Sequence, residues 1–139
     1  MHCSKVALLE PERETEICFL PQADFLVKEV SLFFPLPPKD WVTIASISQG
    51  EEIFDRFRVL GLCGHLSLLT ACAREENPVP LSLRNVSQIQ ILLDFKDYAC
   101  FAYSASVKLY NRGREPVGVS CAALMKFRSP FDCPTKENL

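Results

Sequence analysis

Two stretches near the C-terminal end alternate between apolar residues and residues that are mostly small or polar. This alternation constrains the fold more than any other feature of the chain. The alternate residues of the first stretch are Phe101, Tyr103, Ala105, Val107 and Leu109, and those of the second are Val117, Val119, Cys121, Ala123, Met125 and Phe127. A half-buried β-strand requires this period of two, because successive side chains point to opposite faces. Residues 112–116, RGREP, separate the two stretches and are typical of a turn. We therefore expect a β-hairpin in which Asn111 pairs with Val117.

Shorter apolar runs indicate further strands in the first two thirds of the chain. The expected strands are residues 16–20, 25–34, 41–47, 79–86 and 88–95. Residues 25–34 also fit helical spacing, but we favour a strand because Pro35, Pro37 and Pro38 end the run abruptly. Residues 51–62 fit either a short helix or an irregular strand. A tight connection is expected at Lys96 and Asp97.

The length of 139 residues fits one domain and is sufficient to bury a core. The expected hairpin consists of an alternating strand that ends in asparagine, a glycine-containing turn and a second strand. This pattern is similar to the edges of immunoglobulin-like and C2-like sandwiches. The fold we expect is all-β, an antiparallel β-sandwich of about seven to eight strands with room for one short helix. The two ends, about residues 1–14 and 129–139, are candidates for disorder.

Charge and cysteine content bear on the compartment and on the class of partner. The net charge of −2 argues against nucleic acid as a partner, because nucleic acid binding normally needs a clearly basic face. Seven cysteines without a C-x-x-C pair are typical of free thiols in a reducing compartment. The N-terminus lacks the pattern of a secretory signal, and no segment reaches the roughly 18 apolar residues that span a bilayer. These features predict an intracellular, cytoplasmic location.

Few residues suit catalysis or metal binding, because the chain has only two histidines, His2 and His65. Cys63 and His65 share one face if they lie on a strand, which is the one local pairing that suits a thiol nucleophile. Adding Cys72 gives three metal ligands, one short of the four that structural zinc usually takes. The acidic residues that could contribute to a calcium site are Glu51, Glu52, Asp55, Asp94 and Asp97. Their spacing favours solvated turns over a calcium loop, and we expect neither a cofactor nor a metal.

Three features of the sequence are candidates for binding, and two of them belong to the expected hairpin. Its outward face carries Ala102, Ser104 and Ser106 on one strand and Gly118, Ser120, Ala122 and Leu124 on the other, which is flat and nearly uncharged. Arg112 and Arg114 at the turn, with Lys108 nearby, form a small basic spot. Trp41, the sole tryptophan, stands next to a loop and is the third candidate.

The function that best fits these observations is a non-catalytic intracellular module for protein–protein interaction, an adaptor or scaffold. Its partner would be another protein or a second copy of the chain. The alternative is a sandwich that binds lipid headgroups at a membrane surface or carbohydrate through Trp41 or the Arg112–Arg114 turn. The third hypothesis is a thiol enzyme that uses Cys63 and His65.

Overall fold

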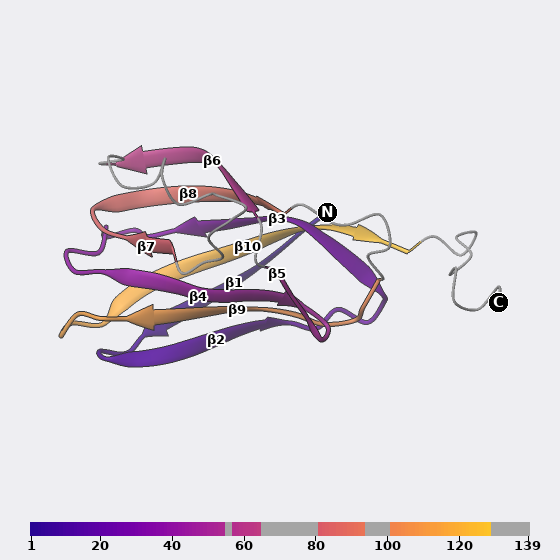
Figure 1. Ribbon diagram of the computed structural model, residues 1–139, viewed down its shortest axis with the longest axis horizontal. Coiled ribbons are helices and arrows are strands. Elements are labelled where there is room, and N and C mark those ends of the chain that lie inside the picture. The colour runs from indigo at the N-terminus through magenta and orange to yellow at the C-terminus, as the bar shows by residue number, and fades with distance from the viewer. Residues whose placement is uncertain (55–56, 65–80, 94–100, 129–139) are drawn as a thin grey trace.

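The described residues form ten β-strands in two antiparallel sheets packed face to face (Figure 1). This computed structural model describes residues 1–54, 57–64, 81–93 and 101–128. The strands are β1 (His2–Leu9), β2 (Arg13–Phe19), β3 (Phe25–Phe33), β4 (Val42–Gln49), β5 (Glu52–Phe54), β6 (Phe57–Gly64), β7 (Leu81–Leu83), β8 (Val86–Leu93), β9 (Ala105–Asn111) and β10 (Val117–Phe127). Eight of them have seven residues or more, and the described residues contain no helix. The predicted antiparallel β-sandwich is confirmed.

Each sheet combines strands from both halves of the chain. Sheet A has the order β1-β10-β3-β8-β6, and sheet B has the order β2-β9-β4-β5, with β7 also paired to β4. The β1–β2, β3–β4, β7–β8 and β9–β10 connections gather at one end of the sandwich, on the left in Figure 1. Along the described parts of the chain, no helix is long and apolar enough to cross a membrane.

The core lies between the sheets and follows the alternation seen in the sequence. Every second residue of β9 and most alternate residues of β10 are buried, including Val107, Leu109, Val119 and Cys121. Burial of these side chains removes apolar surface from water, which is the main favourable contribution to folding. The inward direction predicted for these four residues is therefore correct.

The predicted hairpin, by contrast, is wrong. Strand β9 lies in sheet B between β2 and β4, whereas β10 lies in sheet A between β1 and β3. Asn111 pairs with Arg13 on one side and with Val42 on the other, and not with Val117. Because both edges of β9 are occupied, residues 112–116 cross from one sheet to the other.

The side chain of Asn111 organises this crossing. Its Nδ2 donates to the carbonyl of Glu115 at 2.8 Å and to that of Leu9 at 3.0 Å, and its Oδ1 accepts from the Gly113 N–H at 2.8 Å. Gly113 packs tightly there, because an added Cβ would lie 3.0 Å from the Cβ of Asp40. A buried asparagine with all these partners fixes the connection and ties it to the end of β1.

Gln49 joins the two sheets at the opposite end. Its side chain leaves β4 in sheet B and accepts from the Val27 N–H of sheet A at 2.9 Å. Its Nε2 lies 3.1 Å from the carbonyl oxygen of Phe25, 3.2 Å from that of Ser104 and 3.5 Å from that of Ala102. This amide is buried and satisfied, so it acts as a polar crosslink between the layers.

The remaining strand predictions are mostly confirmed, with two corrections. Residues 25–33 are strand β3, and the ambiguous residues 51–62 contribute to β5 and β6, which are also strands. The single strand expected at 79–86 is instead β7 and the start of β8, separated by a bend in which Asn85 has a φ of 57°. Residues 1–14 were candidates for disorder, yet they form β1 and the beginning of β2, because β10 offers β1 a free edge to pair with. Lys96, Asp97 and residues 129–139 lie outside the described residues.

Candidate interaction surfaces

The residues predicted to form one flat face lie on opposite sides of the molecule. Ser104 and Ser106 are on the outer face of sheet B, and Ser120 and Ala122 are on the outer face of sheet A. The prediction of a single face depended on the hairpin pairing and is wrong for the same reason. The two halves must therefore be considered as separate surfaces.

The outer face of sheet A carries a continuous uncharged area, which we call the sheet-A patch. Strand alternation and register bring together Ser4, Val6 and Leu8 of β1, Gly118, Ser120 and Ala122 of β10, Ser31 and Phe33 of β3, and Gln88 and Gln90 of β8. In one row across the sheet, Val6 faces Ser120, which faces Phe33. Val6 is 84% exposed, Leu8 57% and Phe33 47%. None of the ten side chains is charged.

Charged residues border the sheet-A patch at the end away from the β3–β4 connection. Glu29 pairs with Leu124 of β10 and with Leu92 of β8, and Lys126 is exposed near the end of β10. At the other end, exposed Leu36 and Gly118 line a cleft of about 370 Å³ that the β3–β4 and β9–β10 connections share. The apolar surface thus extends from the sheet toward this cleft.

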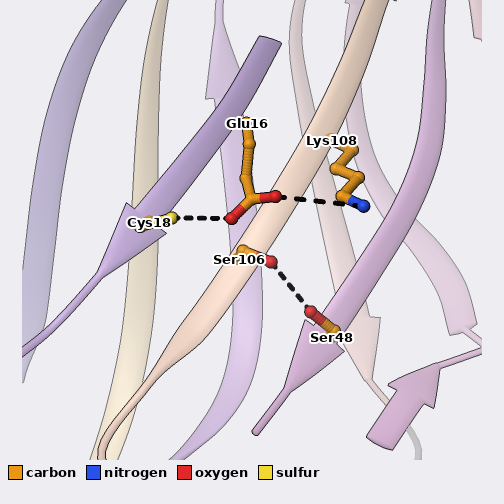
Figure 2. A network of polar contacts seen from close by, with 5 residues as sticks. All are labelled: Glu16, Cys18, Ser48, Ser106 and Lys108. Carbon is orange, nitrogen blue, oxygen red and sulfur yellow. Dashed lines mark hydrogen bonds and ion pairs between the residues drawn. The ribbon is translucent and has the colours of Figure 1, made fainter. Parts of the chain in front are cut away.

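The outer face of sheet B is polar and internally bonded (Figure 2). Glu16 accepts a hydrogen bond from the Cys18 thiol at 2.9 Å and pairs with the Lys108 ammonium at 3.9 Å. The hydroxyls of Ser48 and Ser106 lie 2.8 Å apart on neighbouring strands. Ser104, Ser106 and Lys108 therefore belong to a surface whose polar groups largely satisfy one another.

Cys18 is not an activated nucleophile in this network. Its hydrogen bond to Glu16, followed by desolvation, raises the pKa of the thiol above its ordinary value of 9.0, although Lys5 acts in the opposite direction. Because the thiolate is the reactive form, a raised pKa lowers its reactivity.

Trp41, Arg112 and Arg114 lie at the end where the connections gather, although Lys108 does not join them. The Arg112 N–H donates to the carbonyl of Trp41 at 2.9 Å, and its Nε donates to the Thr43 hydroxyl at 3.2 Å. The guanidinium of Arg84 lies 5.6 Å from the centre of the Trp41 ring. Trp41 is half-buried and has Arg84 over its ring, which is typical of a structural cation–π contact.

The expected basic spot is a cleft with balanced charge. Its lining residues are Glu12, Lys39, Asp40, Arg112, Gly113, Arg114 and Glu115, around a volume of about 600 Å³. Three basic and three acidic side chains offset one another there. Lys108 lies on the sheet-B face beside Glu16 and contributes nothing to this cleft.

The predicted thiol and metal residues fall largely outside the described part of the chain. Cys63 is in β6, whereas His65 and Cys72 lie outside the described residues, as do Asp55, Asp94 and Asp97. Glu51 is exposed at the turn after Gly50. Within the described residues, no group of three or more His, Cys, Asp or Glu side chains is placed to hold a metal ion.

Comparison of the chain with protein-family models, with curated proteins and with solved structures gave no match. The surfaces themselves therefore carry the functional argument. Sequence reasoning missed Val6, Leu8 and Phe33, the three largest exposed side chains of the sheet-A patch. The alternation of Ser4, Val6 and Leu8 is a usable signal of a strand, but it conflicts with the expectation of disorder for residues 1–14.

Proposed function

We propose that this domain is a non-catalytic protein-binding module, an adaptor or scaffold, whose docking surface is the sheet-A patch. The observation that carries the proposal is the contrast between the two outer faces. The sheet-A patch exposes Val6, Leu8 and Phe33 among small uncharged residues, whereas the sheet-B face carries charged and hydroxyl groups paired with one another.

The size and composition of the patch support this role. The sheet-A patch spans four strands that lie about 4.8 Å apart, and about five residues along each strand at about 3.4 Å per residue. Its projected area is therefore roughly 300 Å². The exposed Val6, Leu8 and Phe33 lie among serine and glutamine side chains in this area, and exposed patches of comparable extent on small domains are often functional. An uncharged centre also costs little to desolvate when a partner covers it, because no ion must lose its hydration.

A location in a reducing, cytoplasmic compartment belongs to the same proposal. Cys3, Cys18 and Cys121 are free thiols, which supports it. The alternative of a lipid or sugar site at the Arg112–Arg114 turn has less support, because the acidic residues of that cleft oppose an anionic headgroup and Arg84 lies over the Trp41 ring.

Two matched substitutions test the docking surface. Ala122 and Ser106 are half-buried, outward-facing residues on inner strands of the two sheets, so arginine at either position projects from one face. We expect Ala122→Arg to abolish partner capture from cell extract, since it places an unpaired charge at the centre of the patch. Ser106→Arg should leave capture unchanged. Circular dichroism and thermal melting should report both variants as folded.

The outcomes separate the surfaces. Loss of capture with Ser106→Arg and not with Ala122→Arg would move the docking site to sheet B. Unfolding by Ala122→Arg would mean that the chain itself covers the patch, and Phe33→Ser would then serve as the milder variant. If capture persists in both arginine variants, the cleft around Arg112 and Arg114 becomes the next surface to test.

A further inference from the structure

The outer edge of β1 is a long unpaired edge of sheet A in the described structure. Strand β1 pairs with β10 along His2–Leu9, and no described strand pairs with its other edge. It has eight residues, contains no proline and has one lysine, Lys5. Proteins usually protect such an edge with charges, proline or a bulge, because its unpaired backbone groups can accept another strand.

The neighbouring edge strand shows the contrast. Strand β2, at the same side of the sandwich, carries Arg13, Glu14 and Glu16 among seven residues, and Glu16 is already engaged by Lys108. Charges of this kind discourage strand addition. The two edges are thus built differently, and at this side of the sandwich β1 is better suited than β2 to pairing with a further strand.

We infer that β1 pairs antiparallel with β1 of a second copy across a two-fold axis through Val6, which joins two copies of sheet A into one continuous ten-stranded sheet. This inference concerns the edge of the sheet and stands independently of the proposed function. The occupant is a second copy because the sequence of β1 is complementary to itself. A two-fold axis requires antiparallel pairing in which one residue faces its own copy.

The choice of axis follows from the residues that each register brings together. With Val6 on the axis, Lys5 faces Ala7, Ser4 faces Leu8, Cys3 faces Leu9, and His2 faces Glu10 of the second copy. No two like charges are directly opposite each other: Val6 meets Val6 on the axis, each Lys5 lies against an alanine, and a histidine meets a carboxylate at each end.

The neighbouring registers are less favourable. An axis through Lys5 would place two lysines directly opposite each other, and like charges in that position destabilise a strand pair. An axis through Ala7 would bring Pro11 into the ladder opposite Cys3, where proline cannot donate a hydrogen bond. An axis through Ser4 would shorten the pairing to residues 1–7.

The dimer also makes the uncharged surface continuous across the axis. Val6 begins a row that continues through Ser120 to Phe33. Pairing at Val6 joins this row to its copy, so the two exposed valines, each 84% exposed in the single chain, cover one another. Neighbouring side chains on one face of an antiparallel pair approach to about 4.5–5.5 Å between Cβ atoms.

Light scattering coupled to gel filtration, in reducing buffer over a range of concentrations, tests the dimer. The wild-type chain should run as a dimer at high concentration. Val6→Glu should weaken association by about tenfold or more, because two carboxylates would meet on the axis. Val6→Thr, which keeps a branched uncharged side chain, should behave as wild type. A monomer at every concentration would overturn the inference, as would a dimer insensitive to Val6→Glu.

Disulfide trapping tests the register. After removal of reductant and mild oxidation, Val6→Cys should give a covalent dimer well above the wild-type background from native cysteines, because only the residue on the axis faces its own copy. Ser4→Cys and Ala7→Cys should stay at background. Preferential trapping at either control position would refute the register. Ala122→Arg should retain the dimer even if it loses its partner, so failure of the dimer and failure of the proposed function are distinguishable.

Discussion

Replacing Gln49 tests the polar crosslink between the sheets. In Gln49→Leu the Val27 N–H loses the acceptor that lies 2.9 Å away, whereas the carbonyls of Phe25, Ala102 and Ser104 keep the backbone donors Ala102, Phe25 and Gly50. A buried donor left unsatisfied costs about 1–3 kcal/mol, and each lost hydrogen bond costs about 1 kcal/mol net. We therefore expect a loss of about 3 kcal/mol in the free energy of unfolding.

Thermal and urea unfolding measure this loss. Unfolding entropy of about 2.1 cal/mol/K per residue converts 3 kcal/mol into a fall in Tm of about 10 °C for 139 residues. Ser48→Ala is the matched control on the adjacent position, because it removes only the part-buried hydroxyl contact with Ser106 on the outer face and should cost about 1 kcal/mol or less. A Gln49→Leu variant as stable as Ser48→Ala would refute the crosslink.

Two further predictions concern the core. Val107→Asp should abolish the cooperative unfolding transition seen by circular dichroism, because Val107 is only 2% exposed. An unpaired buried carboxylate costs several kcal/mol out of a total stability of about 5–15 kcal/mol. A cooperative melt close to that of wild type would contradict the place of Val107 in the core. Burial raises the pKa of the Cys121 thiol from 9.0 to about 12, so the unfolded chain loses this proton at a lower pH than the folded chain does. The free energy of unfolding should therefore fall as pH rises between these two values. Cys121→Ala should flatten the slope of unfolding free energy against pH by up to about 1.4 kcal/mol per pH unit, and an unchanged slope would show that Cys121 does not contribute.

The alternation predicted the extent of β10 and the inward faces of both strands from Ala105 onward, but not their partners. It also placed the start of β9 too early, because β9 begins at Ala105 and Tyr103 is 70% exposed. A period of two fixes which side chains are buried, and it carries no information on which strand lies alongside. Residues 112–116 are short enough for a hairpin, so the sequence favoured the local pairing. The side chain of Asn111, bonded to Gly113, Glu115 and Leu9, stabilises the crossing between sheets instead.

The candidate site was harder to predict for the same reason. Ser120 and Ala122 were recognised as outward-facing, yet the surface they belong to depends on neighbours that are distant in sequence. Val6 lies beside Ser120 only because β1 adds to the edge of β10, and Phe33 lies on its other side. Gln49 was overlooked because its partners Val27 and Phe25 come from the other sheet.

Photo-crosslinking at two exposed aromatic positions tests the central claim, that the sheet-A patch binds a protein partner, most directly. Phe33 lies in the patch, and Tyr103, 70% exposed, precedes β9 of the other sheet. A photoreactive phenylalanine fits either position with little disturbance, since both residues are aromatic and exposed. We predict that position 33 crosslinks the captured partner, that position 103 does not, and that Ala122→Arg removes the crosslink from position 33. Crosslinking from position 103 alone, or from position 33 in spite of Ala122→Arg, would contradict the account.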